Sequence, residues 1–424
     1  MINKGGYTLK ILIIGSGAKE HALAWMFSKS RRISGLYVAP GNAGTDALGT
    51  NLSHIDPSDA QAILKACETH QIDYVFAGTE TPLAAGVTDV VKEAGYPVFG
   101  APKSSQRLES DRGFARSFMA RHDIPHNSYF ICSTLEEAEA YIDSQGGNRL
   151  VIKRNGLATS REMIDCKDKD CLLNFAREQL KIDPIIIEDH LKGLPITLTV
   201  LIDGENYLIL PNCSEYTKSE ENERGQPTGG MGAICPVPIL NQAMHESIIS
   251  RIVEPTLKGM QEEGLSYQGV LLFSLILHDE TATVVDYHVR FNDPATQALL
   301  PLIKSDFMDI LQALHNHSIA SFPLEVSEKS SVAVVLASSG YPSHPEAGKT
   351  VTSLPYMGKP EQMLFYGAVD RNEQVLLTTG GRCFTAVGLG TNIQEANERA
   401  YALVPEIDFE GKWFRNDIGN KFFE

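Results

Sequence analysis

The segment from Val284 to Pro294 reads Val-Val-Asp-Tyr-His-Val-Arg-Phe-Asn-Asp-Pro. Its apolar residues alternate with Asp286, His288 and Arg290, which predicts a strand that carries all three polar side chains on one face. Asp293 follows just beyond the predicted strand end. Burying such groups is costly without polar partners, and a divalent metal with phosphate oxygens would supply them. An edge strand whose polar face is simply hydrated explains this segment equally well.

The length and charge of the chain narrow the classes of protein that it can belong to. A chain of 424 residues is too long for one ordinary hydrophobic core, so we expect about three domains. The formal net charge of −16 argues against general binding of nucleic acid or of anionic membranes, because both would be repelled. Any phosphate that the protein handles is therefore expected on a small ligand.

Cysteine spacing and hydropathy give the expected compartment. The seven cysteines form no Cys-x-x-Cys pair, so neither a zinc site nor a disulfide framework is predicted. No apolar run approaches the ~20 residues of a membrane span, and Met1 to Leu9 lacks the apolar segment of a secretion signal. We therefore expect a cytoplasmic enzyme without a membrane partner.

The N-terminal region predicts a strand, a glycine turn and a helix. The apolar strand Leu9 to Ile14 runs into Gly15-Ser16-Gly17 and then into the helical pattern Ala22 to Ser28. Glycines there let backbone N–H groups approach an anion at the positive end of the helix. As a dinucleotide motif the turn is weak, because Glu20 stands where a third glycine would fall.

Further strands and helices alternate up to about residue 108, which predicts a small parallel sheet with ligands at the carboxyl ends of its strands. The predicted helices include Ala60 to His70 and Ala84 to Ala94. From there to about residue 329 the pattern predicts a second domain, with a polar loop that ends in Thr228 to Ala233 and a long helix from Gln242 to Glu263. A final region of short strands and turns, including Gly380-Gly381-Arg382, predicts a third domain.

The order of six motifs resembles the phosphoribosylamine-glycine ligase family of ATP-grasp enzymes, from about Lys10 to the end of the chain. The resemblance implies an α/β and α+β multidomain fold. Its parts would be a Rossmann-like N-terminal domain (1–108), an ATP-grasp domain (109–329, with a mobile subdomain at about 129–195) and a small mixed C-terminal domain (330–424). The motifs are Gly15 to Trp25, Pro40 to Thr45, Glu80 to Leu83, Thr228 to Ala233, Arg290 to Gln297 and Arg399-Ala400-Tyr401.

The resemblance also implies an activity: ATP phosphorylates the carboxylate of glycine, and the amine of 5-phosphoribosylamine displaces that phosphate to form an amide. The implied partners are these small molecules and magnesium or manganese, in a monomer or weak homo-oligomer. The implied catalytic residues are Lys153, Arg290 and Asp293; those for ATP are Arg112, Lys153 and Glu188; those for the metal are Asp286 and His288. The implied substrate residues are Gly15, Gly17, His21, Asn42, Gly44, Thr45, Glu80, Pro82, Thr228, Gly229, Gly230 and Met231.

The departures from the family fall mainly on the nucleotide and metal side. Asp286 and His288 replace a glutamate and an asparagine, and a nitrogen donor suits magnesium poorly. Elsewhere Ala158-Thr159-Ser160-Arg161-Glu162 replaces a mobile Gly/Ala/Lys loop, and Arg112, Pro195 and Ala295 replace a lysine and two glutamates.

Three interpretations follow from these departures. The chain is an active ligase with a modified ATP site, a slow or inactive paralogue that binds a phosphoribosyl ligand, or a ligase for another acid and amine.

Overall fold

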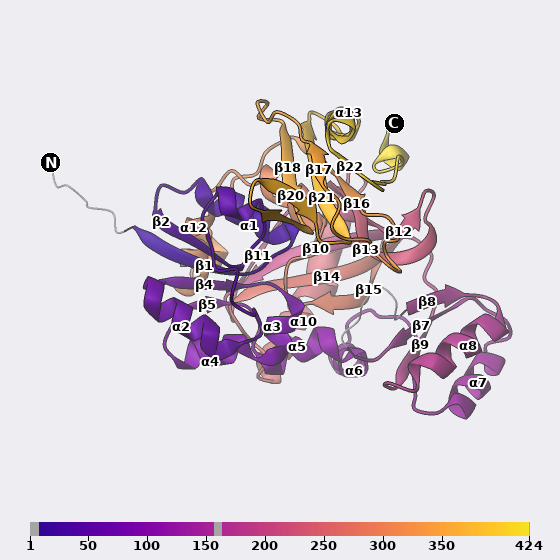
Figure 1. Ribbon diagram of the computed structural model, residues 1–424. Coiled ribbons are helices and arrows are strands. Elements are labelled where there is room, and N and C mark those ends of the chain that lie inside the picture. The colour runs from indigo at the N-terminus through magenta and orange to yellow at the C-terminus, as the bar shows by residue number, and fades with distance from the viewer. Residues whose placement is uncertain (1–7, 157–162, 424) are drawn as a thin grey trace.

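The structure is a computed structural model that describes residues 8–156 and 163–423. Its N-terminal part is a five-stranded parallel sheet in the order β3-β2-β1-β4-β5 (Figure 1). The parallel sheet that the sequence predicts is therefore present. Its strands are β1 (Leu9–Gly15), β2 (Ile33–Pro40), β3 (Thr50–Asn51), β4 (Tyr74–Ala77) and β5 (Val98–Phe99).

The first helix begins earlier than predicted. Helix α1 spans Ala18–Ser28 rather than starting at Ala22, because Gly17 is extended and its N–H is bonded to Glu20 Oε2 at 2.8 Å, which caps the helix there. The predicted helix from Ala84 to Ala94 is also wrong in detail. It is divided at Gly86, where φ is 80°, into α3 (Glu80–Ala85) and α4 (Val87–Glu93). Helix α2 has the predicted bounds, Ala60–His70.

A small antiparallel sheet projects from the rest of the molecule and carries two helices (Figure 1). It follows α5 (Lys103–Ser110) and α6 (Arg112–Arg121) and has a hydrophobic core of its own. Its strand order is β6-β9-β7-β8, and β7 ends directly before the segment 157–162. The elements are β6 (Tyr129–Cys132), α7 (Leu135–Ser144), β7 (Leu150–Arg154), β8 (Met163–Cys166), α8 (Lys169–Gln179) and β9 (Ile185–Asp189).

A second antiparallel sheet, β11-β10-β14-β15, carries the polar face predicted from the sequence. Strand β15 holds Asp286 but ends at His288, so the prediction that Arg290 is also a strand residue is wrong. The ladder stops because the N–H of Val289 is donated to Glu109 Oε2 at 3.0 Å instead of to a neighbouring strand. The strands are β10 (Leu194–Ile202), β11 (Tyr207–Ile209), β14 (Gly269–His278) and β15 (Thr281–His288).

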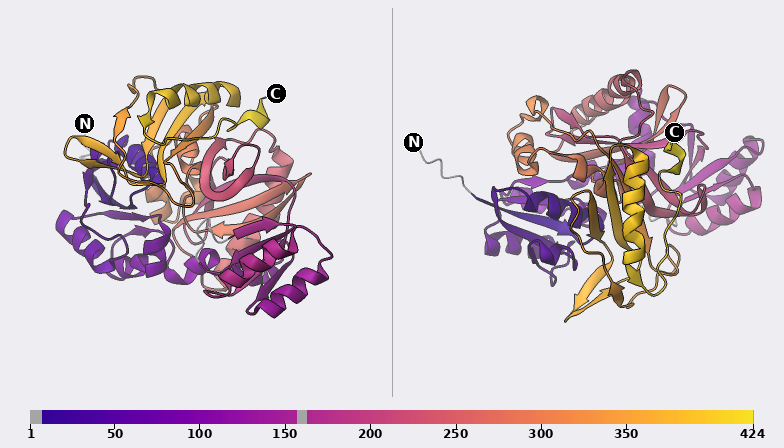
Figure 2. Two further views of the ribbon diagram at one scale, coloured as in Figure 1. Left: turned by 45° about the vertical axis from the view of Figure 1, so that its right-hand side comes forward. Right: turned by 90° about the horizontal axis from the view of Figure 1, so that it is seen from above.

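A third sheet, β12-β13-β16-β21-β18, joins the central and C-terminal regions across residue 330. The predicted polar loop at Thr228 to Ala233 lies instead within β13, because β12 and β16 pair with it on its two sides. Figure 2 shows α13 lying along this sheet. The elements are β12 (Ser214–Glu220), β13 (Arg224–Cys235), β16 (Ser330–Ala337), β18 (Gln362–Tyr366), β21 (Arg382–Gly390) and α13 (Ile393–Leu403).

The predicted long helix from Gln242 to Glu263 is interrupted by a π-helical turn at Ile249–Val253 between α9 (Gln242–Ile248) and α10 (Glu254–Glu262). Among residues 8–156 and 163–423, no helix has the length and apolar character to cross a membrane. The remaining helices and strands are α11 (Ala295–Leu299), α12 (Phe307–His315), β17 (Val351–Ser353), β19 (Val369–Asn372), β20 (Val375–Thr378) and β22 (Asp408–Phe409).

Candidate active site

A buried ion cluster joins the small projecting sheet to β15. Lys153 Nζ lies 3.0 Å from both Glu188 Oε2 and Asp286 Oδ2. Arg116, which is fully buried on α6, donates its Nε to Glu188 Oε1 at 2.6 Å, and its Nη2 lies 3.7 Å from Asp286 Oδ1. Arg112 Nε lies 3.6 Å from the same aspartate oxygen. The predicted ATP residues Arg112, Lys153 and Glu188 are thus brought together with Asp286.

The cluster fixes the ionisation of Asp286. Burial alone would raise the pKa of this carboxyl, but Lys153, Arg112 and Arg116 together hold the pKa well below its usual range. Three cations around two carboxylates leave one positive charge in excess. Such a cluster can attract an additional anion, as a nucleotide phosphate would require.

Arg112 also supports the main chain next to the segment 157–162. Its Nη1 donates to the carbonyl oxygens of Arg154 at 2.7 Å and Gly156 at 3.1 Å. The predicted departures Ser160, Arg161 and Glu162 lie outside the described residues.

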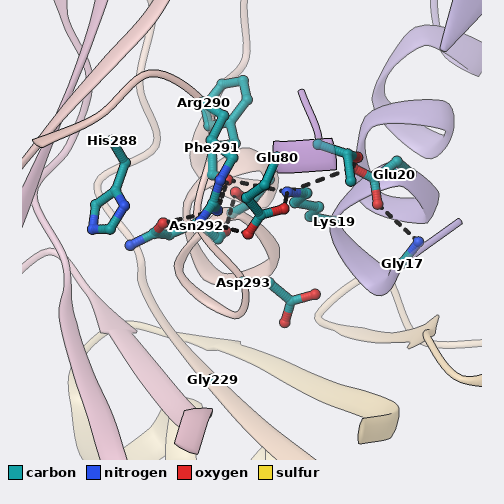
Figure 3. Close-up of polar contacts among 12 residues, drawn as sticks. Gly17, Lys19, Glu20, Glu80, Gly229, His288, Arg290, Phe291, Asn292 and Asp293 are labelled. Carbon is teal, nitrogen blue, oxygen red and sulfur yellow. Dashed lines mark hydrogen bonds and ion pairs between the residues drawn. The ribbon is translucent and has the colours of Figure 1, made fainter. Parts of the chain in front are cut away.

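A second ion cluster surrounds Arg290 (Figure 3). Arg290 Nη2 lies 2.5 Å from Glu80 Oε1 and 2.8 Å from Glu109 Oε1, and His288 Nδ1 lies 3.0 Å from the same Glu109 oxygen. Burial would raise the pKa of Glu109, but Arg290 and His288 lower it to about 2. The cluster therefore holds the start of helix α3, at Glu80, against the end of β15.

Lys19 extends this cluster toward helix α1. Its Nζ lies 3.8 Å from Glu20 Oε1 and 3.9 Å from Glu80 Oε2, and it donates to Phe291 O at 3.5 Å. In Figure 3, Lys19 lies between the start of α1 and Glu80. The side chain is 7% exposed, so it is a buried cation near the predicted phosphoribosyl loops.

The loop 40–45 is held by its own side chains. Asn42 Nδ2 donates to Ser16 O and Tyr366 O, both at 2.8 Å, while Asn42 Oδ1 accepts the N–H groups of Gly44 at 2.8 Å and Thr45 at 3.0 Å. Thr45 is fully buried. Within the described residues, Asn42 and Thr45 thus shape the loop beside the glycine turn, and a substrate contact by either side chain stays a prediction.

His21 connects α1 to the C-terminal region. Its Nδ1 accepts the N–H of Tyr366 at 2.9 Å, and its ring packs against Gly44, where an added Cβ would lie 2.3 Å from the ring. Burial lowers the pKa of His21 to about 4. The neutral ring therefore supports the loop, and its predicted contact with substrate stays a prediction.

Gly229 and Gly230 of β13 lie next to Asp293. Arg382 Nη1 donates to Gly229 O at 2.8 Å, Asp293 O at 2.7 Å and Asp293 Oδ1 at 2.9 Å. A Cβ on Gly230, whose φ is 116°, would lie 2.5 Å from Pro294 Cδ. The close approach explains the glycine, and it brings the predicted residues of β13 to the predicted catalytic Asp293 (Figure 3).

Other predicted residues fall at the same place. Gly15 ends β1 with a φ of 137°, and a Cβ there would lie 2.5 Å from Thr79 Oγ1. Pro82 is buried in α3 and Met231 is fully buried in β13, and a substrate contact by either residue stays a prediction. A Cβ on Gly17 would lie 3.8 Å from Asp293 Oδ2, which places the glycine turn next to the predicted catalytic residue Asp293. Thr228 Oγ1 donates to Thr217 O and braces the hairpin.

Four charged residues of the site were not predicted from the sequence: Glu109, Arg116, Glu215 and Arg382. Glu215 is buried and accepts Asn292 Nδ2 at 3.2 Å; burial raises its pKa. Their partners are distant in the chain, for example 179 positions between Glu109 and His288. For Arg382 the sequence did contain a signal, the Gly-Gly-Arg turn at residues 380–382, since paired glycines mark a tight turn of the backbone.

The predicted metal ligands differ in how well they fit. Asp286 offers carboxylate oxygens, and magnesium in phosphoryl-transfer sites takes one or two carboxylates and otherwise phosphates and water. His288 fits poorly, because one ring nitrogen is bonded to Glu109 and nitrogen is a poor magnesium ligand. Within residues 8–156 and 163–423, no group of three or more His, Cys, Asp or Glu side chains is placed to hold a metal ion.

Three family profiles match the chain in succession. They are the phosphoribosylglycinamide synthetase N domain over residues 9–109, the ATP-grasp (A) domain over 110–296 and the C domain over 331–421. The fold and the converging loops thus define an ATP-grasp protein. The chain belongs to the phosphoribosylglycinamide synthetase family, as the resemblance predicted.

Full-length relatives support this assignment. The chain is 34% identical over 423 residues to the phosphoribosylamine-glycine ligase of Chlorobaculum tepidum, covering 97% of this chain and 100% of the relative. The Vibrio parahaemolyticus ligase is also 34% identical, with 97% and 98% covered. The crystal structure of the Thermotoga maritima ligase has a TM-score of 0.84 and 31% identity, with 97% and 100% covered.

Proposed function

We propose that the protein ligates glycine to 5-phosphoribosylamine with ATP, giving glycinamide ribonucleotide, ADP and phosphate in purine biosynthesis. The supporting observation is Arg290, which follows β15 and pairs with Glu80 and Glu109, both within the segment 9–109 that matches the N domain. This ion cluster joins Glu80, a predicted substrate residue, to the end of β15, the strand that carries Asp286 of the Lys153 cluster. Ligation needs the phosphate side and the amine side of the site close together, because the acyl phosphate and the amine must be aligned.

The first chemical step is transfer of the γ-phosphoryl group. An oxygen of the glycine carboxylate attacks the γ-phosphorus, the bond to ADP breaks, and glycyl phosphate forms. Lys153 and Arg112 offset negative charge on the phosphates, while Asp286 would hold the magnesium that is carried in with ATP. When bound, the metal supplies positive charge to the transferring group. Glu188 keeps Lys153 in position through the 3.0 Å ion pair.

The second step forms the amide. The amine of phosphoribosylamine attacks the carbonyl carbon of glycyl phosphate, the bond from this carbon to the phosphate oxygen breaks, and the proton that the amine loses passes to the departing phosphate. Arg290 carries its charge next to this region and can stabilise the departing phosphate. Arg382 holds the predicted catalytic residue Asp293 by both its backbone carbonyl and its carboxylate, and a Cβ on Gly17 would lie 3.8 Å from Asp293 Oδ2. We assign Asp293 to orienting the amine.

One observation favours the second candidate, a slow paralogue that binds a phosphoribosyl ligand. Lys153 is already engaged by two carboxylates, and a nucleotide phosphate must compete with both. The residues predicted to bind the phosphoribosyl substrate differ less from the family pattern than the residues predicted to bind ATP and metal. This candidate predicts ligand binding without measurable turnover.

The experiment is a direct ligation assay. Purified protein is mixed with Mg-ATP, glycine and freshly generated phosphoribosylamine, and glycinamide ribonucleotide and ADP are measured together by mass spectrometry. Equal amounts of both products support the proposal. Binding of ribose 5-phosphate without either product would instead support the paralogue. Sedimentation of the same sample tests the proposed monomer or weak homo-oligomer.

A further inference from the structure

Arg382 is a charged residue of the C-terminal region that lies at the candidate site. It opens β21, and its Nη1 is anchored to Gly229 and to Asp293 by the bonds described above. The two preceding glycines have φ values of 92° and 98°, a conformation that favours glycine. The N–H of Gly381 is donated to Ser338 Oγ at 2.9 Å. The turn therefore directs the Arg382 side chain toward Asp293.

Two donor nitrogens of Arg382 are left over. In residues 8–156 and 163–423, Nε and Nη2 form no hydrogen bond, and neither is among the buried nitrogens without a partner. These nitrogens therefore reach solvent, and the side chain is 25% exposed. Burial would lower the pKa of Arg382, but Asp293 raises it above its usual value, so the guanidinium stays charged.

The N-terminal, positive end of helix α1 lies near the backbone of Arg382. Ala368 donates its N–H to Arg382 O at 2.8 Å, and a Cβ on the adjacent Gly367 would lie 3.6 Å from Ala18 N. Ala18 is the first residue of this 11-residue helix. The Arg382 side chain reaches the same region through Asp293, since its Nη1 is bonded to Asp293 Oδ1 and a Cβ on Gly17, the cap of α1, would lie 3.8 Å from Asp293 Oδ2. An anion bound by Nε and Nη2 would therefore also be close to the positive end of this helix. The planar fork of arginine suits phosphate in particular.

We propose that Arg382 binds the phosphate group of the phosphoribosyl substrate through Nε and Nη2, while Nη1 anchors it to Asp293 and Gly229. The identity of the substrate rests on the proposed function, but the phosphate contact does not require turnover. Because the same side chain also holds Asp293, substrate binding is coupled to the position of the catalytic carboxylate.

The test is calorimetric titration of the full chain with ribose 5-phosphate and, separately, with Mg-ATP. Arg382→Gln is expected to weaken ribose 5-phosphate binding by about 10- to 100-fold, because a charged hydrogen-bonding fork is lost. Arg382→Lys, which keeps the charge without the fork, should lie between this variant and the wild type. Mg-ATP affinity should stay within about 2-fold of the wild type. The control is Arg251→Gln, at an exposed arginine on the π-helical turn.

The assignment would be overturned if the wild type did not bind ribose 5-phosphate, or if Arg382→Gln bound it as tightly as the wild type does. It would also be overturned if Arg382→Gln lost Mg-ATP affinity to the same extent and had a lower melting temperature, because this result indicates a structural role. In active protein, the KM for phosphoribosylamine should rise and those for glycine and ATP should not. A rise confined to glycine also contradicts the inference. A wild type that binds ribose 5-phosphate through Arg382 but makes no product would reject the ligase function alone.

Discussion

Lys153 Nζ lies 3.0 Å from Asp286 Oδ2, so the lysine of β7 and the aspartate of β15 form one ion pair across two sheets. The same lysine is paired at the same distance with Glu188. Asp286 is therefore ionised, and it lies next to the proposed phosphate ligands Lys153 and Arg112. This relationship links the small projecting sheet to the region where phosphoryl transfer is proposed.

We predict that Asp286→Asn lowers turnover by about 100-fold or more, because the variant loses a metal-holding charge that acts during transfer. Ribose 5-phosphate binding should not change, since Asp286 pairs with Lys153, Arg112 and Arg116 and, among the described residues, has no ion pair with Arg382, the proposed phosphate ligand. Steady-state ligation kinetics and calorimetry measure the two effects. Asp279→Asn is the control, because Asp279 lies at the tip of the same hairpin and is 87% exposed. Near-normal turnover in Asp286→Asn would show that the metal is held elsewhere.

ATP binding is predicted to be weak because of Pro195. This residue lies exposed in β10, its ring has no polar atom, and its carbonyl already accepts Ser214 Oγ at 2.8 Å. It cannot accept the ribose hydroxyls as a carboxylate would, and each lost contact of this kind costs about 1 to 3 kcal/mol. We expect Pro195→Glu to tighten Mg-ATP binding by about 10-fold in a calorimetric titration.

The matched control for this change is Lys192→Glu, which adds a carboxylate at an exposed position three residues earlier. A low-micromolar dissociation constant in the wild type would contradict the prediction. So would equal effects of the two substitutions. Glu162 belongs to the segment that replaces the mobile Gly/Ala/Lys loop of the family; it lies outside the described residues, and its part in the weak binding stays a prediction.

The stability of the fold should depend on pH through His21. Its pKa is about 4 in the folded protein against 6.5 in the unfolded chain, because the ring is buried. The unfolded chain therefore binds a proton first as the pH falls, so His21 contributes full stability above pH 6.5 and loses it between pH 6.5 and 4. The loss amounts to about 3 kcal/mol.

Urea unfolding at pH 7 and pH 4.5 measures this dependence. His21→Asn keeps an acceptor for the Tyr366 N–H without a titrating ring, so its stability should fall less over this interval than that of the wild type. His54→Asn, at an exposed position, should behave as the wild type does. Equal losses in wild type and His21→Asn would refute the assignment.

The sequence was most informative where function rests on local motifs. Lys153, Glu188 and Asp286 were expected on the nucleotide side through the family resemblance, and the structure brings them together. Arg116 was not expected, because a charged residue in a helical pattern usually faces solvent, whereas this one is buried against Glu188. Only tertiary packing decides between these outcomes.

Two local errors have the same origin. The residues from Thr228 to Ala233 are rich in glycine and therefore predict a loop, but pairing with β12 and β16 makes them a strand. Arg290 continues the alternation of a strand, but Glu109 takes the N–H of Val289 and the strand ends. In both cases a partner distant in sequence overrides the local pattern.

The glycine turn gives the final prediction. A Cβ at Gly17 would lie 2.9 Å from Glu20 Oε2 and 3.8 Å from Asp293 Oδ2, so a glutamate there adds bulk and a negative charge at the proposed phosphate position. We expect saturating ribose 5-phosphate or glycinamide ribonucleotide to raise the melting temperature of the wild type and to leave that of Gly17→Glu unchanged.

Gln61→Glu is the control for this experiment, because it adds the same charge on an exposed turn of α2 in the same domain. It should retain the full ligand-induced shift. Gly17→Glu must also be compared with the wild type without ligand, since the capping bond between Gly17 N and Glu20 depends on this backbone and its loss would lower the melting temperature by itself. A wild type whose melting temperature does not respond to saturating ligand would show that the phosphoribosyl pocket is not functional, since a ligand that binds only the folded state must stabilise it.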